Sequence, residues 1–77
     1  MFVVIAGGGK VGRTLARILM SRDNEVMMIE QDRRRYQRLT QEFEESVMFG
    51  DATEIFNLER AGIERADVVA AVTGDDE

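Results

Sequence analysis

Cysteine and histidine are both absent from this sequence of 77 residues. Without cysteine, the chain can form neither a disulfide framework nor a thiolate metal site. Without histidine, the Ser-His and Cys-His nucleophile arrangements and the imidazole metal ligands are excluded. Proline is absent as well, and no internal repeat or low-complexity segment stands out. These absences exclude the commonest nucleophilic and metal-dependent active sites.

A long hydrophobic run is also missing, because no apolar stretch approaches the ~20 residues needed to span a bilayer. The apolar opening at 2–6 is too short for a signal peptide. A net charge of −5 argues against a nucleic-acid partner, whose phosphates demand a basic surface. With 44% hydrophobic and 32% charged residues, the composition is typical of a soluble globular protein. We therefore expect one small cytoplasmic domain over residues 1–77, without direct membrane insertion.

Two kinds of apolar segment alternate along the chain. Short runs typical of buried strands lie at Phe2–Ala6, Val26–Ile29, Val47–Phe49 and Val68–Val72. Between them, apolar residues recur at helical spacing at Val11, Leu15, Ile18 and Leu19, at Tyr36, Leu39 and Phe43, and at Ile55 and Leu58. Asp32 and Thr53 are predicted to cap the second and third helices at their N-termini, and Gly62 to end the third.

This alternation of strands and helices predicts an α/β fold with a parallel sheet. Right-handed crossovers give the strand order 3-2-1-4, with helices on both faces, as in a Rossmann-like half-domain. Such a sheet binds its ligand outside the carboxyl ends of its strands, at the switch point between strands 1 and 4. Residues Val68–Val72 would form an unpaired apolar edge, which invites pairing with another chain. We expect a domain truncated after strand 4, as a fragment of a longer protein, rather than two copies that complete each other.

A glycine-rich loop, Gly7-Gly8-Gly9-Lys10-Val11-Gly12, directly follows the first strand and opens the first helix. Its G-x-G-x-x-G pattern in that context is typical of a dinucleotide-binding turn. Gly7 would permit the tight turn, Gly9 the approach of a pyrophosphate, and Gly12 close packing of helix on strand. The start of the helix would then bind phosphate, with Lys10 nearby. The alternatives are a turn without ligand and a Lys10 that is simply solvated.

Glu30 ends the second strand and lies eighteen residues after Gly12. An acidic residue at about this distance typically accepts hydrogen bonds from the ribose hydroxyls and repels the 2′-phosphate of NADP. Arg33, Arg34 and Arg35 follow closely, and an arginine here can instead accept a 2′-phosphate. We expect NAD/NADH or ATP/ADP as the ligand rather than NADP.

Four segments in this order resemble the N-terminal nucleotide-binding domain (RCK, KTN or TrkA-N) of Trk/Ktr-type potassium-transport regulators. They are the glycine loop, Met28–Asp32, Gly50-Asp51-Ala52-Thr53, and the stretch 71–77 that includes Thr73 and Gly74. The resemblance implies that Asp51, with Ala52 and Thr53, binds adenine. It also implies that Glu30 binds ribose, that Gln31, Asp32 and Arg33 flank ribose and adenine, and that Lys10 reaches phosphate. Glu30 stands where aspartate is commoner, and Lys10 where many members have arginine, so we expect weaker discrimination between phosphate states.

The same resemblance implies a regulatory protein rather than an enzyme. It would form a homo-oligomer, as a dimer or ring, and act on a membrane potassium transporter subunit. Two alternatives stay open: the cofactor-binding segment of an NAD-dependent dehydrogenase, and an assembly scaffold that has lost its ligand. The terminal acids Asp75, Asp76 and Glu77 could hold Mg²⁺ or Ca²⁺, but such a run is more typical of a solvated terminus, and we predict no metal site.

Overall fold

The structure is a computed structural model and describes residues 1–72 of the chain. Strands and helices alternate along it, as the sequence predicts. Short 3₁₀ turns at Glu44–Ser46 and Ile63–Arg65 precede the last two strands. The elements are β1 (Phe2–Ala6), α1 (Lys10–Ser21), β2 (Glu25–Glu30), α2 (Arg33–Phe43), β3 (Val47–Phe49), α3 (Ile55–Ala61) and β4 (Val68–Ala71).

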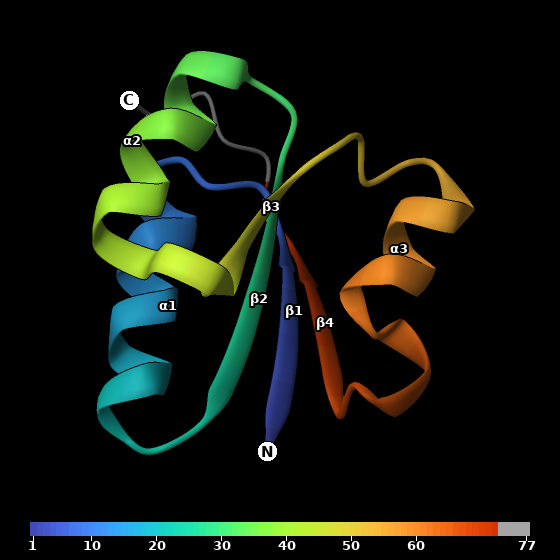
Figure 1. Ribbon diagram of the computed structural model, residues 1–77. Coiled ribbons are helices and arrows are strands. Elements are labelled where there is room, and N and C mark those ends of the chain that lie inside the picture. The colour runs from blue at the N-terminus through green and yellow to red at the C-terminus, as the bar shows by residue number, and fades with distance from the viewer. Residues whose placement is uncertain (73–77) are drawn as a thin grey trace.

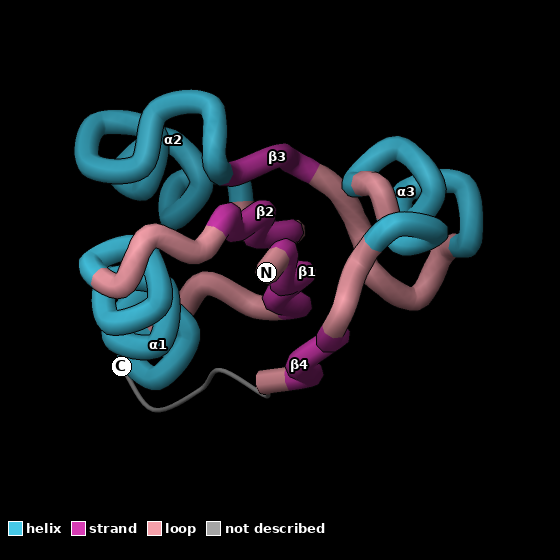
Figure 2. The backbone as a smooth tube through the Cα atoms, turned by 90° about the horizontal axis from the view of Figure 1, so that it is seen from below, coloured by secondary structure: helices cyan, strands magenta, loops and turns pink. Residues whose placement is uncertain are grey.

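The four strands form one parallel sheet in the order β3-β2-β1-β4, which confirms the predicted topology. β1 lies between β2 and β4, so that Val3 pairs with Val26 on one side and Val68 on the other. Helices α1 and α2 cover one face of the sheet and α3 covers the other (Figures 1 and 2). The layers are those of a Rossmann-like half-domain.

The hydrophobic core is divided by the sheet into two parts, because successive residues of a strand point to opposite faces. Val3 and Ile5 of β1 pack toward α1 and α2, whereas Phe2 and Val4 pack toward α3. Met28 and Ile29 divide in the same way along β2. The central strands are therefore buried on both faces, which explains why they appear in the sequence as continuous apolar runs.

Two of the three predicted helix caps are confirmed. Asp32 caps α2 by accepting a hydrogen bond from the backbone N–H of Arg35. Gly62 ends α3 in the left-handed conformation, with φ of 94°. The predicted cap at Thr53 is wrong, because its N–H and hydroxyl both bond to Asp51 and α3 begins only at Ile55.

The predicted apolar stripes of α1 and α3 are only partly right. Val11 and Ile18 are about half exposed, and Ile55 is largely exposed. The fully buried positions of α1 are the small residues Gly12 and Ala16, and Leu15 and Leu19 pack partly buried against the core. β4 also ends one residue earlier than predicted, although the Val72 N–H still donates to the carbonyl of Ala6.

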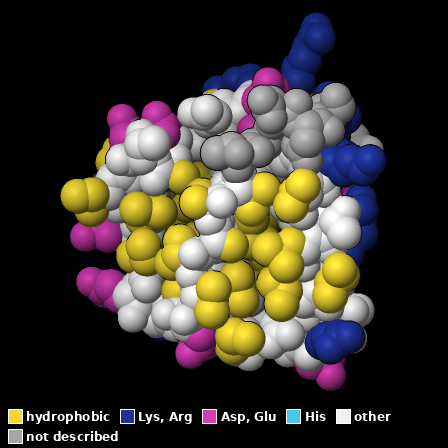
Figure 3. Space-filling model, turned by 180° about the vertical axis from the view of Figure 1, so that it is seen from behind, with side chains coloured by type: hydrophobic (Ala, Val, Ile, Leu, Met, Phe, Trp, Pro, Cys, Tyr) yellow, Lys and Arg dark blue, Asp and Glu magenta, His cyan; other side chains and the backbone are white. Residues whose placement is uncertain are grey.

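An apolar surface lies on the side where β4 forms the edge of the sheet. Val68 and Val69 of β4 are nearly half exposed. Figure 3 shows hydrophobic side chains gathered across this face. Among residues 1–72, no helix is long and apolar enough to cross a membrane.

Candidate functional site

The glycine loop makes a tight turn between β1 and α1. Gly7 has a φ of 114°, which disfavours any residue with a side chain. A Cβ added to Gly7 would lie 2.3 Å from the carbonyl oxygen of Val72, and one added to Gly12 would lie 2.3 Å from that of Gly7. The predicted reasons for glycine at these two positions, the turn and the close packing of the helix, are confirmed.

No separate role was predicted for Gly8. In the structure, the glycine loop contacts α2 at this residue. A Cβ at this position would lie 2.4 Å from Cδ1 of Leu39 and 2.9 Å from Oε1 of Glu30. Its backbone N–H donates to the same Glu30 oxygen at 2.7 Å. A side chain at position 8 would therefore have to displace the side-chain ends of Leu39 and Glu30.

Glu30 is a buried carboxylate, only 3% exposed, at the carboxyl end of β2. Oε1 accepts from the N–H of Gly8, and Oε2 accepts from the N–H of Asp32 at 2.8 Å. A guanidinium nitrogen of Arg35 lies 3.5 Å from Oε2. The side chain thus joins the glycine loop to the start of α2, and its charge is compensated locally, as a buried carboxylate requires.

Asp51 organises the turn that follows β3. Its Oδ1 accepts from the hydroxyl of Thr53 at 2.7 Å and from the N–H of Thr53 at 2.9 Å. These two hydrogen bonds hold the pKa of the Asp51 carboxyl below its ordinary value, and the bond from the hydroxyl has the larger effect. At neutral pH Asp51 is therefore a fixed acceptor.

Asn57 supports this turn from α3 and is one of the few buried polar side chains. Its amide donates to the carbonyl of Asp51 at 2.9 Å. A Cβ at Gly50 would lie 3.0 Å from the same amide, so the absence of a side chain at position 50 allows Asn57 to approach. The conformation of the Gly50–Thr53 turn thus depends on a residue outside it.

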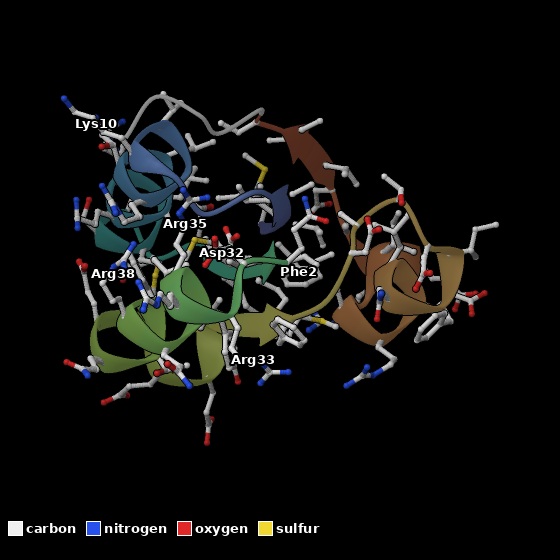
Figure 4. The ribbon with its side chains drawn as sticks, turned by 90° about the horizontal axis from the view of Figure 1, so that it is seen from above. Phe2, Lys10, Asp32, Arg33, Arg35 and Arg38 are labelled. Carbon is white, nitrogen blue, oxygen red and sulfur yellow. The ribbon has the colours of Figure 1, made fainter. Side chains whose placement is uncertain are left out.

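These segments meet around a cavity of about 420 Å³ at the carboxyl ends of the strands. Figure 4 looks down on this edge of the sheet: Arg35 lies beside the strands, whereas Lys10 extends outward from the beginning of α1. The lining comes from the ends of β1, β2 and β4, from the turn after β3 and from α2: Ala6, Gly7, Ile29, Glu30, Gln31, Arg35, Gly50, Asp51, Ala52, Thr53, Ala71 and Val72. Ligands of doubly wound sheets bind at this edge.

The structure brings some of the predicted site residues together in this cavity, namely Gly7, Glu30, Gln31, Asp51, Ala52 and Thr53. Asp32 instead caps α2, and the guanidinium of Arg33 lies 4.3 Å from the ring centre of Phe49. Lys10 and Val11 line a separate, mostly apolar groove of about 360 Å³ along α1. Thr73 and Gly74 lie outside the described residues.

Two residues that the structure places at the site were not among the predicted site residues: Arg35 in the cavity lining and Asn57 behind the turn. The prediction placed Arg33 beside ribose and adenine, and considered Arg34 and Arg35 only as possible acceptors of a 2′-phosphate. The sequence indicates a role for Asn57 less clearly, because its only unusual feature is an amide next to the apolar Leu58. Within residues 1–72, no group of three or more acidic side chains could hold a metal ion. The acidic stretch 75–77 lies beyond the described part of the chain.

Comparison with known proteins gives one consistent result. A family model described as the TrkA-N domain matches residues 3–77. Over all 77 residues, the chain is 44% identical to the Trk system potassium uptake protein TrkA homolog of Methanothermobacter thermautotrophicus, and covers 36% of that protein. It is 39% identical to the homolog of Pyrococcus abyssi, covering 34%, and 35% identical to the Trk system potassium uptake protein TrkA of Haemophilus influenzae, covering 17%.

The chain thus spans about a third or less of the length of these relatives. The family model matches nearly all of this chain. The matched residues include both the glycine loop and the turn after β3. The chain belongs to the TrkA-N domain family.

Proposed function

We propose that this domain binds an adenine nucleotide in the cavity at the carboxyl ends of β1 to β4. One observation carries the proposal: Glu30, Gln31 and the Asp51–Thr53 turn, far apart in the sequence, line a single cavity beside the glycine loop. A cavity of about 420 Å³ lies within the usual size range of small-ligand sites.

The ribose of the nucleotide would bind at Glu30. Each carboxylate oxygen accepts one backbone N–H, and each can accept a further bond because an ionised carboxylate has about four acceptor positions. Ribose hydroxyls are donors, so they suit a group that can only accept. The backbone bonds also hold the carboxylate in one orientation before the ligand arrives, which limits the entropy lost on binding.

The adenine would lie against the turn after β3. The intramolecular bonds of Asp51 fall on Oδ1, and Oδ2 is then the acceptor that we assign to the exocyclic amine of adenine. The lowered pKa of Asp51 keeps this acceptor ionised. Ile29 and Ala52 supply apolar lining for the face of the base.

The phosphates would bind at the beginning of α1. This helix has no acidic residue in its first turn, and its N-cap residue, Gly9, makes no side-chain capping bond. The positive end of the helix dipole is therefore not compensated by the residues of that turn, which favours an anion there. Lys10, the first residue of the helix, adds a positive charge.

The domain would act as a regulatory part of a potassium uptake system. Relatives that bear the name Trk system potassium uptake protein support this proposal. Binding of NAD/NADH or ATP/ADP would shift a cytoplasmic homo-oligomer between arrangements that act differently on a membrane transporter, provided that the ligand prefers one arrangement. A non-catalytic role agrees with the two cavity carboxylates, since Glu30 is held by backbone bonds and the pKa of Asp51 is lowered.

Isothermal titration of the full-length protein against ATP, ADP, AMP, NAD, NADH, NADP and GTP tests the proposal. We expect the adenine nucleotides with a free 2′-hydroxyl to bind, and GTP and NADP to bind more weakly. Lys10→Ala should weaken ATP more than AMP, because AMP lacks the terminal phosphates. Absence of binding to every adenine nucleotide would overturn the proposal and leave the scaffold alternative.

A further inference from the structure

Helix α2 has one side that no other described element covers (Figures 1 and 2). Leu39 and Phe43 point to the opposite side, where both are buried in the core. Residues three and four positions apart share one side of a helix, so the exposed residues opposite this pair form a continuous stripe. Together with the two exposed residues that directly follow the helix, they make up the outer stripe of α2: Arg34, Gln37, Arg38, Gln41, Glu44 and Glu45.

The charges of the outer stripe run in the order opposite to the one that stabilises a helix. Arg34 and Arg38 lie toward the N-terminal end, where the first turn after the capping Asp32 has no acidic residue. Glu44 and Glu45 lie at the carboxyl end, and the last turn of the helix has no basic residue. The helix dipole favours the reverse order, and two arginines four positions apart repel each other. Stabilising α2 within a single copy of the domain therefore does not explain these charges.

Neighbouring charged residues have partners within the domain. Glu42 pairs with Arg17 of α1, and the guanidinium of Arg33 stacks on the ring of Phe49. Among residues 1–72, by contrast, the structure gives no ion pair to any of the four charged residues of the outer stripe. These four charges are therefore available to a partner outside the domain.

The order of the charges favours a second copy of the same chain as that partner. A uniformly anionic surface, such as nucleic acid or an anionic bilayer, would attract the arginine end of the stripe but repel its glutamate end. Two α2 helices in antiparallel orientation instead place the arginines of each copy near the glutamates of the other, with their dipoles opposed. A contact about a two-fold axis requires such a self-complementary surface. Gln37 and Gln41, between the two ends, can donate and accept hydrogen bonds across the axis.

We propose that the outer stripe of α2 is a contact surface between two copies of this chain, with the two helices antiparallel about a two-fold axis. The inference goes beyond the proposed function, because it does not depend on nucleotide binding. A contact made mainly of exposed ion pairs is weak and becomes weaker as salt is added. It lies on the helix whose Arg35 lines the cavity, so that the contact and the candidate site share one structural element.

Chemical crosslinking in the full-length protein tests the position of the contact. The 77 residues contain no cysteine, and Gln41→Cys, in a protein without other cysteines, provides a thiol within the outer stripe. A short bismaleimide should join two copies through this thiol, and raising NaCl to about 0.5 M should reduce the yield. Glu59→Cys, exposed on α3 across the sheet, is the matched control and should give little product. Equal yields at the two positions would overturn the inference.

An exchange of charges tests whether complementarity holds the contact. The acidic variant carries Arg34→Glu and Arg38→Glu, the basic variant carries Glu44→Arg and Glu45→Arg, and both carry Gln41→Cys. Each variant alone should lose about fivefold or more of the crosslinked product, because like charges then face each other. Coexpression of the two variants, with tags of different size, should restore the product between unlike copies.

Undiminished crosslinking of either variant alone, or no recovery on coexpression, would overturn the inference. Loss of binding to vesicles of phosphatidylcholine and phosphatidylserine in the acidic variant alone would assign the arginines to a membrane and overturn it as well. Thermal unfolding checks that each variant is folded. If the acidic variant is not, the basic variant and the salt dependence of the Gln41→Cys protein decide. Failure to bind any adenine nucleotide would overturn the proposed function but not this inference.

Discussion

The carboxylate of Glu30 accepts the backbone N–H of Gly8 at 2.7 Å, across 22 residues of chain. This bond joins the end of β2 to the glycine loop, and its acceptor is the side chain to which we assign the ribose. Position 30 therefore contributes both to the stability of the fold and to the candidate site, and the two contributions can be measured separately.

Glu30→Ala should lower the free energy of unfolding without nucleotide by about 2–4 kcal/mol, because it leaves the N–H groups of Gly8 and Asp32 without their acceptor. It should also weaken adenine nucleotides by roughly 1–3 kcal/mol. Urea denaturation and calorimetric titration measure the two effects. Glu45→Ala, at an exposed position, is the control and should change neither. Unaltered nucleotide affinity in a folded Glu30→Ala protein would exclude Glu30 from the ribose site.

Gly12→Ala should destabilise the domain by about 1–3 kcal/mol, although alanine is the better helix former. The added Cβ would lie 2.3 Å from the carbonyl oxygen of Gly7, which is backbone and cannot rotate away. Thermal unfolding of this variant is compared with that of Thr14→Ala, an exposed position on the same helix, which should be close to neutral. Equal stability of the two variants would show that α1 can move away from the loop freely.

Asn57→Ala should destabilise the domain by about 1–3 kcal/mol, because the carbonyl of Asp51 loses its buried donor. It should also weaken adenine binding, since the turn that carries Asp51 loses its support. Glu59→Ala, exposed on the same helix, is the matched control for both measurements. A loss of stability with full nucleotide affinity would separate the turn from the binding site.

Asp51→Ala should reduce the preference for adenine over guanine, because the acceptor assigned to the exocyclic amine disappears. Asp51→Asn is the sharper variant: its carbonyl can keep the bonds to Thr53, while its amide can donate to the oxygen of guanine. Titration with ADP and GDP measures the preference. If neither variant changes the base preference, adenine is not bound by Asp51.

Acid should destabilise the fold. Hydrogen bonds from Arg65 and Arg17 lower the pKa of Glu25 and Glu42, and the N–H of Arg35 lowers that of Asp32. A carboxyl with a lowered pKa in the folded state stabilises the fold above its unfolded pKa and loses that contribution as the pH falls through its folded pKa. The free energy of unfolding should therefore be constant near neutrality and decrease below about pH 4.5.

The variant Asp32→Asn separates the helix cap from the surface ion pairs. Asparagine is as good an N-cap as aspartate but has no charge to titrate. Stability at pH 7 should thus change little, while the decrease between pH 5 and pH 2 becomes smaller. Chemical denaturation over this pH range provides the measurement, and an unchanged acid profile would show that the Asp32 cap does not contribute to it.

Much of the fold was predictable because its signals are local. Buried strands appear as short apolar runs, and Gly7 and Gly12 stand at the spacing that the loop requires. The ends of the third helix show the limit of such signals: Gly62 was predicted correctly from its position, whereas Thr53 was assigned a cap that its bonds to Asp51 exclude. The conformation of the turn decides whether Thr53 caps the helix or bonds to Asp51. Residue type alone does not determine this choice.

By itself, the sequence determined the order of the elements, the parallel sheet and the place of the glycine loop, since each follows from periodicity or backbone freedom within a few residues. Only the tertiary structure decided that Arg35, and not Arg33, lies in the cavity, that Asn57 supports the turn of Asp51, and that Val11 and Ile18 remain exposed. These outcomes depend on the rotation of each helix about its axis and on its distance from the sheet. Contacts between residues remote in the sequence set both quantities.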